Sequence, residues 1–182
     1  MRVRLREKYS EGELQRIYSK PHEHSYWYDH RVRVQTSIGM IKAYLPFESA
    51  ADLSAGDATI INALDIPTKH IGDYAPGYQY TGPIEATIRQ IPNVDLFICS
   101  ETLEHIDEPD ALLFDIRTKT KWLLLTTPFG EIDSSNPEHY WGWDGKGINE
   151  MLQRAGFQPE ALNVLEFFDK ECIYKYQIWV AR

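Results

Sequence analysis

Short apolar runs alternate with helical stretches through most of the chain after residue 45. Two of these runs, at residues 94–99 and 122–127, are almost continuously apolar, which is typical of strands buried on both faces of a sheet. Shorter runs end in the acids Asp52 and Asp73. Helices are predicted between the strands, at residues 59–64, at 84–91 and from about residue 109. Strands that alternate with helices in this way predict a parallel sheet with right-handed crossovers.

One long helix is predicted before the first strand, over residues 25–45. Its inner face repeats at three- and four-residue steps through Trp27, His30, Val34, Ile38, Ile41 and Leu45. Pro46 ends it. The basic run at residues 2–8 is expected to be a frayed, solvated terminus. Residues 1–45 are therefore expected to form N-terminal cap helices on a core at residues 46–182, and the lack of linker-like stretches predicts a single domain, 1–182.

The alternation breaks in the last third of the chain. A long loop is predicted from residue 129, followed by a helix that ends at Ala155 and Gly156. The final apolar runs, at residues 162–168 and 172–180, are separated by only three residues. Parallel neighbours need a connection of roughly a dozen residues or more, so this connection predicts a C-terminal antiparallel hairpin. Residues 77–83, bounded by turn formers, are predicted to be an edge-type strand.

Composition excludes several classes of protein. The formal net charge of −8 argues against a protein that coats nucleic acid, because such binding depends on neutralising phosphates. Cys99 and Cys172 lie in apolar strand-like runs and are expected to be buried, reduced thiols, which fits a reducing compartment. The sequence shows neither a signal-peptide h-region nor an apolar run of membrane-spanning length. We therefore expect a soluble, cytoplasmic protein without a membrane partner.

Residues 52–58 are the stretch on which the candidate chemistry depends. They read Asp52-Leu-Ser-Ala-Gly-Asp-Ala58, an acid at a strand end followed by a turn of small residues and a helix N-terminus. Such a turn lets a ligand approach the backbone and offers it free N–H groups. Asp73 ends the next strand about twenty residues later, where an open α/β sheet places a carboxylate for ribose hydroxyls. Taken alone, this stretch is compatible both with a ligand-binding turn and with a strand–helix connection that binds no ligand.

Several motifs in order resemble those of the class I S-adenosylmethionine-dependent methyltransferases. Residues 52–58 resemble that family's Asp-Leu-Gly-Cys-Gly-Asp-Gly turn, and residues 95–106 resemble its fourth motif, including the Leu-Glu-His ending. Residues 126–128 resemble its Ser/Thr-Pro step, and residues 143–157 its closing helix. The resemblance covers residues 46–182. It implies an α/β fold with a Rossmann-like, mostly parallel seven-stranded sheet, helices on both faces and the C-terminal antiparallel hairpin.

The resemblance also implies S-adenosylmethionine as cofactor and methyl transfer to an oxygen or nitrogen atom of a small molecule or a nucleic-acid end. Asp73 matches the ribose-binding acid, and the step from Pro83 to Ile84 falls where the adenine is held. The residues expected to bind the cofactor are Asp52, Ser54, Gly56, Asp57, Asp73, Tyr74, Ile84, Ser100 and Glu101. The acceptor itself and the oligomeric state are not predicted.

The chain departs from the family pattern in its first motif. Ser54 and Ala58 stand where the family has its first and third glycines, and only Gly56 is kept. Serine is the more awkward change, because glycine at that position permits unusual backbone angles. The alternative function is therefore a cofactor-binding but inactive methyltransferase-like partner subunit. A nucleotide-binding oxidoreductase fits less well, given the terminal hairpin and the Leu-Glu-His stretch.

The Leu-Glu-His stretch supplies the candidate catalytic residues, His105 as a base with Glu104 beside it. Glu101, Glu104 and His105 have helical spacing, which would place them on one face as ligands for Mg²⁺ or another divalent metal. Similar runs carry a metal in the ubiquinone-pathway O-methyltransferases. His139 is the expected fourth ligand, with His24 as the next candidate. The alternatives are a histidine that only caps or packs and a Glu101 that faces the cofactor amine.

Two stretches are expected to select the acceptor, residues 18–30 and residues 129–147. The second is rich in glycine and in the aromatic residues Tyr140, Trp141 and Trp143, and it is predicted to be a mobile lid. For Trp143 we expect packing against the fold instead.

Overall fold

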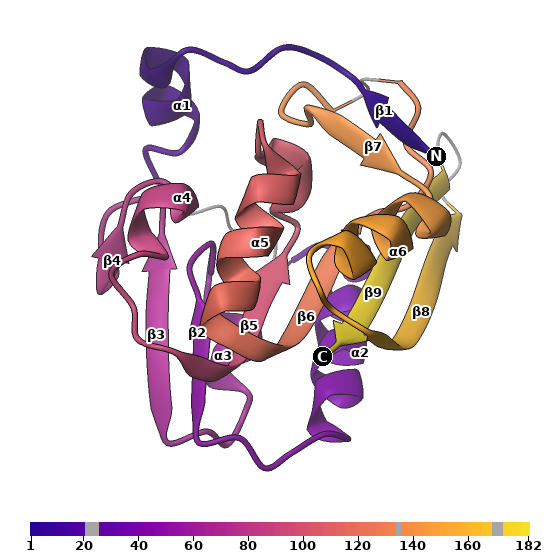
Figure 1. The fold of residues 1–182 in the computed structure, drawn as a ribbon. Coiled ribbons are helices and arrows are strands. Elements are labelled where there is room, and N and C mark those ends of the chain that lie inside the picture. The colour runs from indigo at the N-terminus through magenta and orange to yellow at the C-terminus, as the bar shows by residue number, and fades with distance from the viewer. Residues whose placement is uncertain (21–25, 134–135, 169–172) are drawn as a thin grey trace.

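The computed structural model describes residues 1–20, 26–133, 136–168 and 173–182. Its main feature is a seven-stranded sheet (Figure 1). The strands are β2 (Ser49–Asp52), β3 (Thr68–Asp73), β4 (Tyr80–Thr81), β5 (Val94–Ser100), β6 (Thr120–Pro128), β8 (Pro159–Phe168) and β9 (Ile173–Ala181). Their spatial order is β4-β3-β2-β5-β6-β9-β8. The five strands from β4 to β6 in this order are parallel, and β9 is antiparallel to both β6 and β8.

The predicted fold class is confirmed. The sheet is mostly parallel, and the hairpin of β8 and β9 closes it with Phe168 opposite Ile173. The second strand of the hairpin, β9, lies between β6 and β8. The hairpin therefore joins the parallel strands through β9, which pairs with β6, and β8 forms the edge of the sheet. The predicted edge strand at residues 77–83 is present as β4, although only two of its residues pair with β3.

Helices cover both faces of the sheet (Figure 1). One face carries α2 (Tyr28–Lys42) and α3 (Thr59–Asn62), and the other carries α4 (Ile84–Thr87), α5 (Pro109–Lys119) and α6 (Gly145–Arg154). The predicted helix over residues 25–45 is α2, and Val34, Ile38 and Ile41 form its buried face. Trp27 is its N-cap and is 46% exposed, and His30 is only half-buried, so the buried stripe begins about two turns later than predicted.

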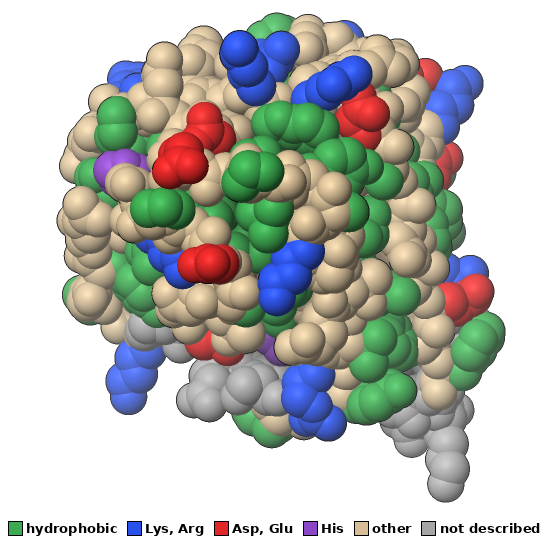
Figure 2. All heavy atoms as spheres, turned by 90° about the horizontal axis from the view of Figure 1, so that it is seen from below, with side chains coloured by type: hydrophobic (Ala, Val, Ile, Leu, Met, Phe, Trp, Pro, Cys, Tyr) green, Lys and Arg blue, Asp and Glu red, His purple; other side chains and the backbone are tan. Residues whose placement is uncertain are grey.

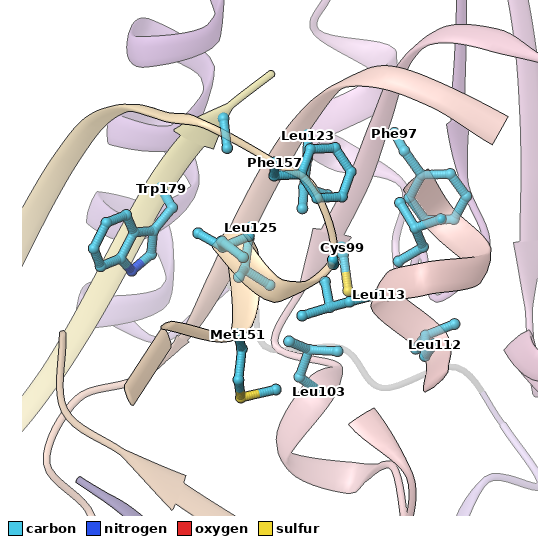
Figure 3. Close-up of a cluster of buried hydrophobic side chains, with 14 of the residues drawn as sticks. Phe97, Cys99, Leu103, Leu112, Leu113, Leu123, Leu125, Met151, Phe157 and Trp179 are labelled. Carbon is cyan, nitrogen blue, oxygen red and sulfur yellow. The ribbon is translucent and has the colours of Figure 1, made fainter. Parts of the chain in front are cut away.

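Two clusters of buried side chains, one on each face of the sheet, form the core. Figure 3 shows the cluster beneath α5 and α6, in which Phe97, Cys99, Leu123 and Leu125 of the central strands meet side chains of the two helices. The other cluster joins α2 and α3 to the opposite sides of β2, β5, β6 and β9. Because the central strands are buried on both faces, their sequences are continuously apolar instead of alternating.

The first three residues of the basic N-terminal run form a strand, β1 (Arg2–Arg4), so the expectation of a frayed terminus is wrong there. β1 pairs antiparallel with β7 (Trp141–Trp143), which lies inside the stretch predicted to be a loop. The Arg2 guanidinium lies 4.1 Å from the centre of the Trp141 ring, and Arg4 donates to Asp107 at 2.5 Å. A three-residue strand carries no readable period, and its stability comes from these tertiary contacts. α1 (Glu11–Ile17) follows β1.

None of the helices in the described part of the chain is long and apolar enough to cross a membrane. Figure 2 shows the end of the molecule at which the parallel strands begin, and there basic and acidic side chains are interspersed without forming a basic patch. Cys99 is a buried free thiol, as expected. Cys172 lies outside the described residues.

Candidate functional site

The carboxyl ends of the parallel strands border a cavity of about 390 Å³. Ligands of open α/β sheets bind at this edge, where the strand order reverses. The loops after β2, β3 and β5 form the floor of the cavity, and α1 and α2 supply side chains to its wall. All nine residues predicted to bind the cofactor line it: Asp52, Ser54, Gly56, Asp57, Asp73, Tyr74, Ile84, Ser100 and Glu101.

Asp73 holds the turn after β2 in place. Its Oδ2 accepts a hydrogen bond from the Gly56 N–H at 2.9 Å, and its Oδ1 accepts from the Ala75 N–H at 2.9 Å. Gly56 has a φ of 55°, a conformation that glycine adopts without strain. Each carboxylate oxygen has a second lone pair, so Asp73 is oriented by backbone donors and can still accept from hydroxyl groups of a ligand.

Backbone strain in the first motif falls on Ala58 and not on Ser54. Ser54 does not have a positive φ, and its Oγ lies 2.6 Å from Thr102 Oγ1. Ala58, the N-cap of α3, has a φ of 57°. The sequence-based expectation had the order reversed, since it treated serine as the awkward change and alanine as the mild one. The objection to an intact cofactor turn at Ser54 therefore does not hold.

Asp52 is buried beneath this turn, with 3% of its surface exposed. Burial raises the pKa of Asp52 to about 7; the hydrogen bond from the Ser54 N–H opposes this shift, and the neighbouring charges of Asp73 and Asp57 add to it. A buried acid that titrates near neutrality at the wall of a cavity is a frequent mark of a functional site.

Glu101 does not lie with Glu104 and His105 in the cluster of possible metal ligands that the sequence spacing predicted. Only residues Leu103–His105 are helical, as a single 3₁₀ turn, and Glu101 precedes that turn with a φ of 51°. Glu101 Oε1 accepts a hydrogen bond from Thr126 Oγ1 at 2.8 Å. The helical face expected to join Glu101, Glu104 and His105 therefore does not form, because helical spacing in the sequence is meaningful only where the chain is helical.

Glu104 and His105 do come together with His139, with their ligand atoms all within 4.8 Å of one another. Glu104 is fully buried; Thr127 Oγ1 donates to its Oε2 at 3.0 Å, and its Oε1 has no hydrogen-bond partner among the described residues. Burial raises the pKa of Glu104 to about 8; Glu101 adds to this shift and His139 opposes it. Of the three residues, only His105 lines the cavity.

The contacts of His105 indicate which ring nitrogen carries the proton. Its Nδ1 lies 3.1 Å from the carbonyl oxygen of Glu138 and 3.2 Å from the Tyr18 hydroxyl. A carbonyl oxygen can only accept, so Nδ1 is the donor and the lone pair of the neutral ring is on Nε2. Burial raises the pKa of Tyr18, which stays a phenol in the physiological range.

His139 is held by two neighbours. Its Nδ1 lies 2.7 Å from Glu131 Oε2, and its Nε2 lies 3.0 Å from Asn136 Nδ2. Asn136 Oδ1 accepts from the Glu138 N–H, which fixes the direction of the amide. Burial lowers the pKa of His139, but the hydrogen bond to Glu131 and the nearby carboxylates outweigh it, and the net shift is upward. His24, the other candidate ligand, lies outside the described residues.

The predicted lid at residues 129–147 does not border the cavity: none of its described residues lines it. His139, Tyr140 and Trp143 are buried in the fold, as we expected for Trp143 alone. Three residues of this stretch, Trp141–Trp143, form β7, which pairs with β1, so the stretch is not a loop throughout.

The N-terminal segment borders the cavity where the lid was expected, and of its residues at the cavity the sequence-based prediction named only Tyr18 and His30. The side chains that it adds to the cavity are Lys8, Glu11, Leu14, Tyr18, His30 and Arg33. The first four recur at three- and four-residue steps, which is a helical signal. No residue of α1 is completely buried, so the side chains on this face do not need to be apolar. Because they are of mixed polarity, the hydrophobic pattern does not reveal the helix. Tyr18 and His30 are the first and last residues of the stretch predicted to select the acceptor, and both line the cavity.

No protein-family model and no curated protein matches the sequence. Solved structures are nevertheless similar in fold. The chain is similar to magnesium protoporphyrin IX methyltransferase from Synechocystis PCC 6803, solved with S-adenosylhomocysteine, at 16% identity and a TM-score of 0.65, over 93% of this chain and 92% of that one. It is also similar to 1,6-didemethyltoxoflavin-N1-methyltransferase from Burkholderia thailandensis, at 14% identity and a TM-score of 0.63, over 100% and 94%.

The cyclase SpnF shares the fold as well, at 12% identity and a TM-score of 0.64, over 91% and 85% of the two chains. Proteins of this fold therefore differ in the reaction for which they are named, and activity has to be argued from the site. At these identities the comparisons describe architecture. This chain has the Rossmann-like fold of the class I S-adenosylmethionine-dependent methyltransferases.

Proposed function

We propose that this protein binds S-adenosylmethionine in the cavity at the strand ends and transfers its methyl group to an oxygen or nitrogen atom of a small molecule or a nucleic-acid end. The observation that carries the proposal is that all nine sequence-predicted cofactor residues, together with His105, line one cavity. Those residues lie at or just after the ends of β2, β3 and β5, except for Ile84, which begins α4 after β4. Segments up to about fifty residues apart in the sequence therefore meet at one site.

The residues fit the cofactor by chemistry. Asp73, oriented by two backbone N–H groups, would accept from both ribose hydroxyls. Ile84, almost fully buried, and Pro83 would hold the adenine, and Gly56 would let the backbone approach the adenosine. When bound, S-adenosylmethionine supplies both the methyl group and its leaving group, so no covalent intermediate with the protein is needed.

His105 is the residue proposed to act on the acceptor. Its Nδ1 donates to the Glu138 carbonyl, which directs basicity to Nε2, and its side chain lines the cavity. A base there would take the proton from an acceptor hydroxyl or amine as the methyl group is transferred. Positioning the two reactants contributes much of the rate enhancement in such a reaction, up to roughly 7–11 kcal/mol when geometry is ideal.

A divalent cation is proposed as the second element of this site, held by Glu104, His105 and His139. His139 Nε2 would exchange its hydrogen bond with the Asn136 amide for the ion, while Nδ1 keeps Glu131 as its partner. The observation that favours it is Glu104 Oε1, a buried carboxylate oxygen without a hydrogen-bond partner among the described residues, beside two imidazoles. A carboxylate and two imidazoles suit Mn²⁺ or Zn²⁺, and Mg²⁺ would add water ligands. The ion would acidify an acceptor hydroxyl, which gives His105 the role of ligand instead of base.

The test uses labelled S-adenosylmethionine with a panel of small-molecule and RNA fractions, with the wild-type protein and His105→Ala. Label transfer by wild type and its loss in His105→Ala, with cofactor affinity unchanged, would support the proposal. Cofactor binding without transfer in any fraction would support the inactive partner subunit. Once an acceptor is known, loss of transfer in EDTA, its recovery with Mn²⁺ or Mg²⁺ and the same loss in Glu104→Gln would support the metal; indifference to EDTA would leave His105 as a base.

A further inference from the structure

The two edges of the seven-stranded sheet differ in length. At one edge lies β4, which has only two residues, and at the other lies β8, which has ten. β8 pairs with β9 on its inner side, and among the described residues no strand lies on its outer side (Figure 1). Backbone N–H and C=O groups alternate in direction along a strand, so about half of those of β8 point outward. β8 therefore offers a long template for pairing with another strand.

The features that usually prevent pairing at an edge strand are confined to the start of β8. Pro159 is its first residue, and the register is irregular only between Pro159 and Ala161. After that point the strand contains neither proline nor a basic residue. Leu162, Val164 and Phe168 lie on one face of the strand and are 46%, 42% and 76% exposed. Edge strands commonly carry lysine at such positions, and β8 carries apolar side chains instead.

The charges on β8 are balanced within the chain. Glu160 and Glu166 are the only charged residues of the strand. Glu160 Oε1 lies 2.6 Å from Arg182 Nε, and Glu166 Oε1 lies 2.5 Å from Lys175 Nζ of β9. The chain as a whole has a formal net charge of −8, which opposes the approach of two copies. At this edge the opposition is removed locally, because each carboxylate already has its own cation.

We propose that β8 pairs antiparallel with β8 of a second copy of this chain, around a two-fold axis, so that the two sheets become one. A two-fold interface uses the same surface on both copies and closes after two. Pairing of β8 with β4 of another copy would instead leave edges open for a filament, and β4 is too short to cover β8. The inference goes beyond the proposed function and does not depend on it, because no residue of β8 lines the cavity.

The pairing identifies the substitution that should prevent it. Pairing along the whole of β8 brings its middle residues, Asn163 and Val164, beside their counterparts in the second copy. A lysine at position 164 would place two like charges together and remove the apolar contact. Val164→Lys should therefore raise the dimer dissociation constant at least about tenfold. Phe114→Lys is the matched control, since Phe114 is 49% exposed on α5, away from this edge, and it should leave the constant unchanged.

Sedimentation velocity of the full chain at increasing concentration tests the proposal. A single strand pair makes a small interface, so wild type should pass from monomer to dimer with a dissociation constant of about 1–100 μM. Phe114→Lys should do the same, and Val164→Lys should remain a monomer over this range. Hydrogen exchange of wild type gives a second readout that needs no variant: amides of residues 162–168 should exchange more slowly in the concentrated protein than in the dilute protein.

Several results would overturn the proposal. These are a wild type that stays monomeric, a dimer that Val164→Lys leaves intact, an equal loss in Phe114→Lys, and growth of wild type beyond the dimer. If Val164→Lys does not fold, exchange in wild type decides: slowing with concentration at β8 supports the pairing, and slowing only elsewhere, or none, refutes it.

Discussion

Ser54 Oγ and Thr102 Oγ1 lie 2.6 Å apart, so a hydrogen bond ties the turn after β2 to the turn after β5. Thr102 also donates to the Ser100 carbonyl oxygen at 3.1 Å. The residue that replaces the family's first glycine is thus a link between two loops of the cavity. Ser54 is not in a conformation that requires glycine, and its hydroxyl gives the substitution a structural role.

Ser54→Ala should therefore destabilise the fold by about 0.5–1.5 kcal/mol through loss of this hydrogen bond. Ser54→Gly should not restore stability, because it loses the same hydrogen bond and adds backbone freedom. Urea denaturation of both variants and of Thr102→Ala measures this. In the double variant Ser54→Ala/Thr102→Ala the two losses should not add, and full additivity would show that the hydroxyls do not interact.

Asp73→Ala should weaken S-adenosylmethionine binding by about 1–3 kcal/mol, since two ribose hydroxyls would lose their acceptor. The fold should survive, because the side chain lies at the end of β3 and faces the cavity, but with lower stability, because the Gly56 and Ala75 N–H groups lose their acceptor. Calorimetry on the folded variant measures the change. Asp65→Ala removes an exposed carboxylate from the loop before β3 and serves as control. Equal affinity in Asp73→Ala and wild type would refute the ribose assignment.

Hydrogen exchange should place the mobile cover on α1 and not on residues 129–147. α1 has no fully buried residue, although Glu11 and Leu14 line the cavity, so its amides should exchange fast in the free protein and slow down with S-adenosylhomocysteine. β7 pairs with β1, and its amides should be protected in both states. Fast exchange in β7 that slows with ligand would restore the original lid prediction.

Gly147→Ala should destabilise the protein by about 1–3 kcal/mol, because the added Cβ would overlap the backbone oxygen of Met1 and force β1 away from α6. Gly145→Ala is the matched control on the same helix, where the nearest atom to a Cβ is Phe129 Cε2 at 3.5 Å. Thermal denaturation compares them, with exchange at residues 2–4 as the local readout. Equal melting temperatures would contradict the docking of β1.

The fold could be predicted from the sequence because its signals are local. Continuous apolar runs mark strands buried on both faces, and the three residues after Phe168 permit only an antiparallel turn. The cofactor residues could be predicted for a related reason. Asp52 and Asp73 end parallel strands, and the ends of parallel strands meet at one edge of a sheet whatever the rest of the chain does.

The parts that only the tertiary structure decided involve residues far apart in the chain. β1 has three residues and gains its partner β7 about 140 positions later, and Arg33 meets Thr126 across 93 positions. Glu101 has helical spacing to His105 but lies outside the helical turn, whereas His139 reaches His105 from another loop. Periodicity records only which face of its own element a residue occupies. Which elements then lie against each other depends on how their faces pack. This packing brought Glu11, Leu14 and Arg33 to the cavity, beside the residues predicted from the sequence.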